Sequence, residues 1–499
     1  MKSEWKFIKS AAKGLILLTL ALLACRFSKG AAAGVLAAAA VVCGFSGKLG
    51  WAITAYAFFP MLVIMNPVVC PAVGMTGIFA RGGCFLLSII LMVTAAQRRG
   101  NHAIPLGGIW LYLIIATVSS LGGYAPVVSY LKLVSFVLFV VGLNIGFRNI
   151  DKRAQDLNVV RTFFHAFSLL VIFGSYFIRI FLPGAAYLDT LQMAREGDLG
   201  EATAVAAQGG KMLFAGILNQ SQCLAVITPC CLAWLICDML FVERRITKFH
   251  IGTCVCGIPI VYMTGSRVSF LATAVAGFFI YFYCVGKINI SRKVRNSLRS
   301  AMTLGIVAMI AVCGVMEVKN HSISKWLRKT DDVAGDTRGL GEAFTASRMG
   351  KVEENLFDFR QNPVLGTGFQ VAYYMKNMYK DAQFILSAPI EKGVLPLMVL
   401  GETGLVGGIF FVVFLAVFYG TCIKKKYYCT MTLMTVMITC NMAEANFFSP
   451  GGVGGMLWMI CVGGGFVIDT ISLYRRRVER ELAEIARMRE MQMMGVGGR

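Results

Sequence analysis

The sequence predicts an all-α, polytopic membrane protein. We expect about 12–14 transmembrane helices and one large, partly helical extracytoplasmic loop before the last three helices. Of its 499 residues, 57% are hydrophobic and 15% are charged, whereas an ordinary soluble domain carries about 25% charged residues. Apolar runs long enough to cross a hydrocarbon core of about 30 Å recur along almost the whole chain. Such a surface is incompatible with water, so the composition indicates membrane insertion.

The helix assignments follow from these apolar runs. The first run, after a basic start, resembles a signal peptide. Another apolar run begins at Ala31, where a polar mature domain would be needed, so we interpret the first run as a retained helix. The first two helices are short, and a re-entrant pair there would give the lower of the two counts. The predicted helices span residues 14–26, 30–44, 50–69, 83–97, 104–121, 126–147, 160–182, 216–240, 250–265, 268–286, 300–316, 394–421, 428–446 and 451–472.

The chain has a formal charge of +22. The positions of its basic residues indicate how the protein is oriented in the membrane rather than nucleic-acid binding. The basic clusters fall in turns that lie two membrane crossings apart, so all of them can face the cytoplasm together. They carry nearly the whole positive excess and would contact anionic lipid headgroups. Both termini are then predicted inside, and no nucleic-acid partner is expected.

This orientation divides the chain into five regions. Residues 1–215 are N-terminal membrane helices with an outside loop at 183–215, and residues 216–316 are central membrane helices. The other regions are an extracytoplasmic loop at 317–393, the last three membrane helices at 394–472 and a cytoplasmic, helical tail at 473–499.

The loop at 317–393 is predicted to be folded, because it is rich in aromatic residues and nearly neutral in charge. Residues 353–360 can form an amphipathic helix with Leu356, Phe357 and Phe359 on or near one face. Asn362–Pro363 would end that helix. We expect this part of the loop to lie on the membrane surface.

Arginines at the outer edge of the membrane are the first candidate site residues. The Ser266–Arg267 pair occupies a tight outer turn, and a guanidinium there has donors suited to phosphate. The alternative is an interfacial arginine that reaches lipid headgroups. Arg348 and Arg360 lie in the loop, and their alternative is a solvated helix face.

Three further charged residues lie at the same edge. Glu391 immediately precedes a membrane helix, where partial desolvation would suit a carboxylate to accept a proton. Lys392 could instead stabilise its anion, which leaves a simple boundary ion pair as the alternative. Glu444 ends the penultimate helix and could pair with one of the arginines, in a structural or a direct role.

No metal or cofactor is expected from the histidines or from the glycine-rich stretches. His102, His165, His250 and His321 are far apart in the sequence, which predicts no histidine cluster. The run at 451–455 has no lysine and no strand–turn–helix setting, so it is not a phosphate loop. Small residues are common where membrane helices touch.

The sixteen cysteines are scattered, mostly within apolar segments, and no pair has the spacing of a metal site. We interpret them as small packing residues. Cys70 and Cys84 both fall near an outside turn, and whether they form a disulfide stays open.

Four short patterns occur in order along residues 216–465. They are Met263-Thr-Gly-Ser-Arg267; Arg348 followed by Asn362-Pro-Val-Leu-Gly-Thr-Gly368; Glu402-Thr-Gly-Leu-Val-Gly407; and Asn441 to Ser449 followed by two glycines. In this order the stretch resembles the O-antigen ligase and polymerase family. These are membrane glycosyltransferases that use polyprenyl-pyrophosphate-linked sugars. The long outside loop before three helices is also similar, whereas the first 200 residues resemble the family in hydropathy only.

The resemblance implies a metal-independent, inverting transfer. Arg267 and Arg348 would bind the pyrophosphate and stabilise it as it leaves, and a base would take the proton of the acceptor hydroxyl. The ligases place a histidine shortly before the Glu-x-Gly-x-x-Gly pattern, and this chain has none there. Glu391 is the nearest titratable residue, and we expect it to be the base. The absence of this histidine puts a lipid A-core acceptor in doubt and leaves open that the chain is a polymerase or uses an unrelated acceptor.

The sequence therefore predicts an enzyme of the bacterial cytoplasmic membrane with its active site on the extracytoplasmic side. It would transfer an undecaprenyl-pyrophosphate-linked glycan to a glycan, lipid or protein acceptor. Ser266, Arg360, Lys392 and Glu444 would contribute to substrate binding. The runner-up is a transporter or flippase of lipid-linked oligosaccharide, although such proteins tend to place functional charges at the midplane. A non-catalytic assembly partner is a third reading.

Overall fold

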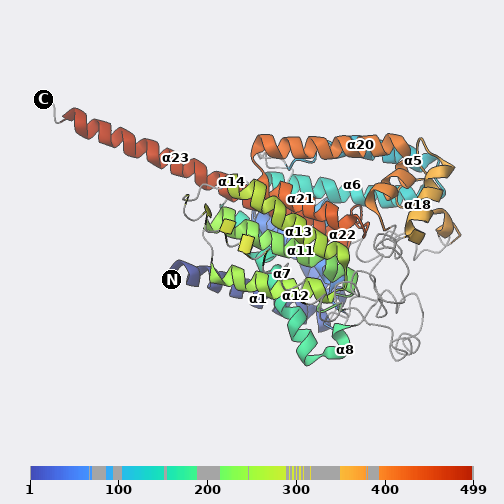
Figure 1. Cartoon of the computed structure of the whole chain (residues 1–499), viewed down its shortest axis with the longest axis horizontal. Coiled ribbons are helices and arrows are strands. Elements are labelled where there is room, and N and C mark those ends of the chain that lie inside the picture. The colour runs from blue at the N-terminus through green and yellow to red at the C-terminus, as the bar shows by residue number, and fades with distance from the viewer. Residues whose placement is uncertain are drawn as a thin grey trace.

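The computed structural model is helical in almost every part that it describes (Figure 1). It describes residues 2–27, 29–66, 68–69, 86–93, 104–150, 154–187, 214–244, 247–287, 349–377, 379 and 393–496, and isolated positions between 292 and 315. Residues 86–93, inside one predicted membrane helix, are helical. Within this part of the chain, β-type pairing occurs at one place, an isolated antiparallel bridge between Met65 and Leu218.

The described elements follow the predicted order, and most of them coincide with a predicted apolar run. They are α1 (Lys2–Phe27), α2 (Lys29–Phe45), α3 (Leu49–Ile64), α5 (Ile109–Leu121), α6 (Pro126–Asn149), α7 (Ala154–Phe181), α8 (Pro183–Ala186), α11 (Ser221–Cys237), η3 (Asp238–Glu243), α12 (Lys248–Met263), α13 (Arg267–Phe279), η4 (Ile280–Cys284), α14 (Val285–Lys287), α18 (Met349–Gln361), η5 (Tyr373–Met375), α20 (Leu395–Lys425), α21 (Tyr428–Asn441), α22 (Val453–Leu457), η7 (Trp458–Gly464) and α23 (Gly465–Val496).

Five helices of the described part are long and apolar enough to cross a membrane, and several shorter apolar helices pack with them. Large apolar side chains remain exposed on the outer surface of the bundle, among them Val127, Ile180 and Val412. Lipid, unlike water, tolerates such a surface. The all-helical, membrane-type fold is confirmed at this level. The five helices are Pro126–Arg148, Gln155–Phe181, Ser221–Glu243, Leu395–Lys425 and Val453–Gln492.

Some boundaries differ from the sequence prediction for local physical reasons. α3 ends at Ile64 instead of residue 69, because the backbone of Asn66 turns to bond Ile217. The last predicted span, 451–472, does not stop. Its helix continues as α23 to Val496 without a break, across the boundary placed at residue 473, and projects from the bundle (Figure 1).

The bundle has two ends, which we call the loop end and the tail end. The loop end carries α18 and the α5–α6 turn, where the amide of Tyr124 donates to the carbonyl of Thr367 at 3.1 Å. The tail end carries the projecting part of α23, where Arg244 forms an ion pair with Glu479. The two ends lie on opposite sides in Figure 1.

A buried carboxylate holds two of the last helices together near the tail end. Asp469 on α23 accepts hydrogen bonds from the backbone amides of Cys429 and Thr430 at 3.0 and 2.8 Å, and from the Thr430 hydroxyl at 2.8 Å. These amides belong to the first turn of α21 and have no partner inside their own helix. Asp469 therefore caps α21 from a neighbouring helix, where the partial positive charge of a helix start favours an anion.

Candidate functional site

The Glu-x-Gly-x-x-Gly pattern forms a break within α20 at the loop end. Gly404 has φ 64° and ψ −167°, which no continuous helix allows. The break frees amides that would otherwise bond one turn back, and the loop after α18 supplies their acceptors. Leu405 donates to the carbonyl of Pro363 at 2.8 Å, and Val406 donates to that of Val364 at 3.2 Å. Two of the patterns read from the sequence are therefore in direct contact.

The same loop also bonds the residues before the break. The amide of Thr367 donates to the carbonyl of Gly401, and that of Gly368 donates to Glu402, both at 3.0 Å. Gly366 has φ 74°, and a Cβ there would overlap the main chain of Glu402. The glycines of the loop are required because two backbones approach each other here.

Lys132 and Gln370 fix the next part of the loop to the bundle. Lys132 is fully buried in α6, and its ammonium donates to the carbonyl of Gln370 at 3.1 Å. The side-chain amide of Gln370 donates to the carbonyl of Phe448 in the turn after α21. The loop thus bonds to α6, to α20 and to the 442–450 turn at the loop end.

The predicted amphipathic helix exists as α18, but its buried face is not the predicted one. Asn355 and Asp358 are buried, whereas Phe357 is 43% exposed. The polar pair lies against Gly401 of α20, where a small residue leaves room for their backbone and Cβ. Arg360 is exposed on the other face. A hydrophobic pattern could not locate this contact, because polar residues make it.

Two tyrosines at the loop end have a raised pKa. Burial, together with the Asp358 carboxylate and Tyr373, raises the pKa of Tyr124 to about 12. Burial is also the first cause that raises the pKa of Tyr379, with smaller contributions from Tyr374 and Glu402. Both phenols are therefore neutral at physiological pH, and both carry a proton that can be donated in a hydrogen bond.

Arg267 is the first residue of α13 and is only 7% exposed. Ser266 is the N-cap, and its hydroxyl accepts from the amide of Ser269 at 3.4 Å. The cap explains why the chain starts a helix at this turn. Ser266 therefore has a structural role, and the guanidinium is held below the surface at the end of the bundle.

Glu444 lies in the turn that follows α21 and is 4% exposed. The hydroxyl of Ser269 donates to the carbonyl of Ala225, and the thiol of Cys440 donates to that of Val226. The start of α13 and the end of α21 therefore meet neighbouring carbonyls of α11. This arrangement places Arg267 and Glu444 at the same end and level of the bundle. Whether they pair stays a prediction.

Several predicted site residues lie outside the described residues. They are Arg348, Glu391 and Lys392, and the same holds for Cys70 and Cys84. Their roles stay predictions.

Lys132 and Glu402 are buried charged residues that our sequence reasoning did not select as site residues. The signal for Lys132 was present, because it is the only charged residue in the first five turns of an apolar helix. Glu402 was noted only as part of a pattern, and its burial follows from the break in α20.

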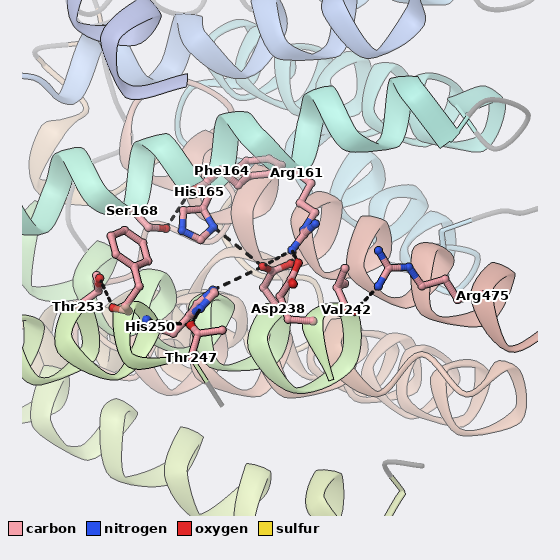
Figure 2. A network of polar contacts seen from close by, with 12 residues as sticks. Arg161, Phe164, His165, Ser168, Asp238, Val242, Thr247, His250, Thr253 and Arg475 are labelled. Atoms are coloured by element: carbon pink, nitrogen blue, oxygen red, sulfur yellow. Dashed lines mark hydrogen bonds and ion pairs between the residues drawn. The ribbon is translucent and has the colours of Figure 1, made fainter. Parts of the chain in front are cut away.

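A second polar cluster lies inside the tail end (Figure 2). Arg161 on α7 binds Asp238 through two nitrogens, at 2.6 and 2.8 Å, and also binds Glu243 at 2.6 Å. His165 and His250 face the same Asp238 carboxylate, and their ring centroids are 5.3 Å apart. The prediction that no histidine cluster exists is therefore wrong for these two. Sequence separation hid the cluster, because helix packing brings α7 and α12 together.

The π-helical turn η3 explains how Arg161 reaches two carboxylates. Residues five apart point in different directions on an α-helix but are aligned in a helix with i→i+5 bonding. Asp238 and Glu243 are the first and last residues of η3. This brings both carboxylates to Arg161 on α7.

The residues at the two ends differ in chemistry. The loop end holds a buried arginine, a buried lysine and two buried glutamates near the described loop residues 362–377, and the tail end holds an ion-pair network with two imidazoles. Comparisons with family models and with curated proteins found no match to this chain.

Proposed function

We propose that the chain is a membrane glycosyltransferase that uses an undecaprenyl-pyrophosphate-linked glycan and acts at the outer face of the bacterial cytoplasmic membrane. Its active site would be the loop end. The activity would be O-antigen ligase-like or polymerase-like, in cell-surface polysaccharide biosynthesis. The acceptor would be a hydroxyl of a glycan, lipid or protein.

One observation carries this proposal. The loop that contains Asn362 to Gly368 bonds directly to the broken start of α20, which contains Glu402 to Gly407. Both patterns are among the four on which the resemblance rests, although nothing in the sequence brings them together in space. Their contact supports a shared site. Arg267, buried at the same end, would supply the cation that such a site needs for a diphosphate.

The proposed reaction needs a leaving-group clamp and a base. Arg267 and Arg348 would bind the pyrophosphate while the acceptor oxygen attacks the anomeric carbon. The bond from that carbon to the pyrophosphate oxygen breaks, and polyprenyl pyrophosphate leaves with the electron pair. Glu391 would take the proton of the acceptor hydroxyl. Glu444 would hold Arg267, while Arg360 and Lys392 would contact the donor.

Transfer by purified protein in nanodiscs tests the clamp. Wild type is given a lipid-linked oligosaccharide and an acceptor panel, and released polyprenyl pyrophosphate is measured with glycan product. We expect Arg267→Ala and Arg348→Ala each to lower release at least about 100-fold, since each removes a charge from the leaving group. Arg477→Ala is the matched control, because Arg477 is an exposed arginine on α23. Full release by both clamp variants would refute the proposal.

The base is tested separately. Glu391→Gln should lower turnover while binding of the donor persists, because an amide cannot accept the proton. Glu353→Gln, at an exposed glutamate of α18, is the control and should leave turnover unchanged. Unchanged turnover in Glu391→Gln would remove Glu391 from the mechanism without affecting the clamp.

The ion-pair network of Arg161, Asp238 and Glu243 favours one other candidate function, a flippase of lipid-linked oligosaccharide. Buried charges in membrane bundles often mark transport pathways. A flippase would move labelled donor between leaflets of a vesicle and release no polyprenyl pyrophosphate. Leaflet exchange that persists in Arg267→Ala without release of polyprenyl pyrophosphate would favour this alternative.

A further inference from the structure

Two imidazoles converge on a single carboxylate oxygen inside the tail end (Figure 2). His165 Nδ1 lies 3.9 Å from Asp238 Oδ2, and His250 Nε2 lies 3.7 Å from the same oxygen. The three side chains come from α7, η3 and α12, and none is more than 3% exposed. Their ligand atoms all lie within 4.8 Å of one another.

The spacing is informative because it exceeds that of a hydrogen bond. An N–H donor and its oxygen acceptor lie about 2.7–3.2 Å apart, so both imidazoles stand back from the oxygen. Ligand atoms bonded to a tetrahedral metal at about 2.1 Å are separated by about 3.4 Å. The two nitrogen–oxygen distances lie a few tenths of an ångström above that spacing, and all three ligand atoms lie within 4.8 Å of one another, so modest side-chain shifts would bring them around one ion.

The surroundings also suit a metal. The Nδ1 of His250 is hydrogen-bonded to the hydroxyl of Thr247, which can accept from it and leave the lone pair of Nε2 directed at Asp238. Arg161 holds the carboxylate of Asp238 through two bonds and so fixes its plane. Glu243 accepts from the same Nη2 of Arg161 that bonds Asp238, and it offsets the positive charge of the guanidinium.

We propose that His165, Asp238 and His250 bind a divalent transition-metal ion of the zinc type, which ties α7, η3 and α12 together. Two imidazoles and one carboxylate suit zinc and other divalent first-row transition metals, whereas magnesium and calcium require oxygen ligands. The site lies at the opposite end of the bundle from the proposed glycan chemistry and does not depend on it. Its role is to hold three helices in register.

Metal content tests the proposal directly. The chain is produced with an affinity tag that lacks histidine, in medium with added zinc, and bound metals are quantified by mass spectrometry. We expect close to one ion per wild-type chain, and less than about a tenth of that in His165→Ala and His250→Ala. Thr253→Val is the matched control, because its hydroxyl bonds only a backbone carbonyl of α12, and it should keep the ion.

A second variant tests the proposal if the alanine variants fold poorly. Thr247→Val retains every ligand but removes the hydroxyl that bonds the second nitrogen of His250, so it should weaken zinc binding about 10–100-fold. The same hydroxyl caps α12, and its loss destabilises that helix, so zinc affinity is compared at equal folded yield. Cobalt loaded in place of zinc would report the site through its visible absorption. Wild type with no ion and no cobalt spectrum would overturn the proposal and leave an ion-pair cluster only. The same holds if the ion persists unchanged in the two alanine variants.

Discussion

The amide of Leu405 donates a hydrogen bond to the carbonyl of Pro363 at 2.8 Å. This contact joins the broken start of α20 to the loop after α18 through main-chain atoms. The break is therefore not a weak point of the helix, because the loop supplies the acceptors that the helix lacks. Inside a membrane protein, irregular backbone is tolerated only where other protein groups or water satisfy it.

Gly404→Ala should destabilise this junction. Gly404 has φ 64°, and a Cβ there would overlap the carbonyl of Val364. We expect a loss of at least about 1–3 kcal/mol, measured by thermal unfolding in detergent. Gly420→Ala, in the same helix with open space around it, is the control and should be neutral or slightly stabilising. Equal effects of the two substitutions would contradict the described break.

Lys132→Met should loosen the loop. The substitution keeps most of the apolar volume but removes the donor to the buried carbonyl of Gln370, at a cost of about 1–3 kcal/mol. The measurement is the rate of proteolysis within residues 362–379, which should rise. Lys376→Met replaces an exposed lysine of the same loop and should leave that rate unchanged. A wild-type rate in Lys132→Met would show that this anchor is dispensable.

Asp469→Ala should release the start of α21. Three hydrogen bonds are lost, and amides remain buried without an acceptor, so we expect at least about 1–2 kcal/mol. Hydrogen exchange at Cys429 and Thr430 should accelerate. The neighbouring Thr470→Val is the control, since the Thr470 hydroxyl has no hydrogen-bond partner among the described residues. Protection unchanged at both amides would refute the cap.

Arg161→Met should be among the most damaging substitutions at the tail end. It leaves the buried Asp238 and the partly exposed Glu243 without their cation, and an unpaired buried charge costs about 3–5 kcal/mol. Adding Asp238→Asn in that background should recover part of the loss, as read from chemical unfolding. Arg477→Met breaks an exposed pair with Glu481 and should change stability by less than about 1 kcal/mol. Similar losses for the two arginines would argue against a buried network.

The helical architecture could be predicted because it depends on the length and apolarity of local segments. α6, α7 and α20 lie where their runs predicted, and α18 forms before Asn362 as expected. The break at Gly404 was visible only as a pattern, because its conformation depends on the loop that contacts it. The burial of Asn355 and Asp358 was missed, since polar residues that face a partner element resemble polar residues that face water.

The tail-end cluster could not be predicted for a different reason. His165, Asp238 and His250 belong to separate helices, and their meeting depends on how α7 packs against α11 and α12. The π-helical turn that begins at Asp238 also changes which residues lie on the same face of the helix. No local periodicity contains that information. Lys132, by contrast, could have been selected from the sequence alone as a single charge in an apolar helix.

The junction between the loop and α20 also affects how distant relatives can be found. Main-chain atoms make most of the hydrogen bonds between the loop and α20, so many side chains along the junction can change without altering its geometry. Positions such as Gly366 and Gly404, where a Cβ has no room beside the facing main chain, are the most constrained. Sequences with the same architecture can therefore differ almost everywhere else. A search for them should score the two local patterns around Gly366 and Gly404, separated by a stretch of any length and composition.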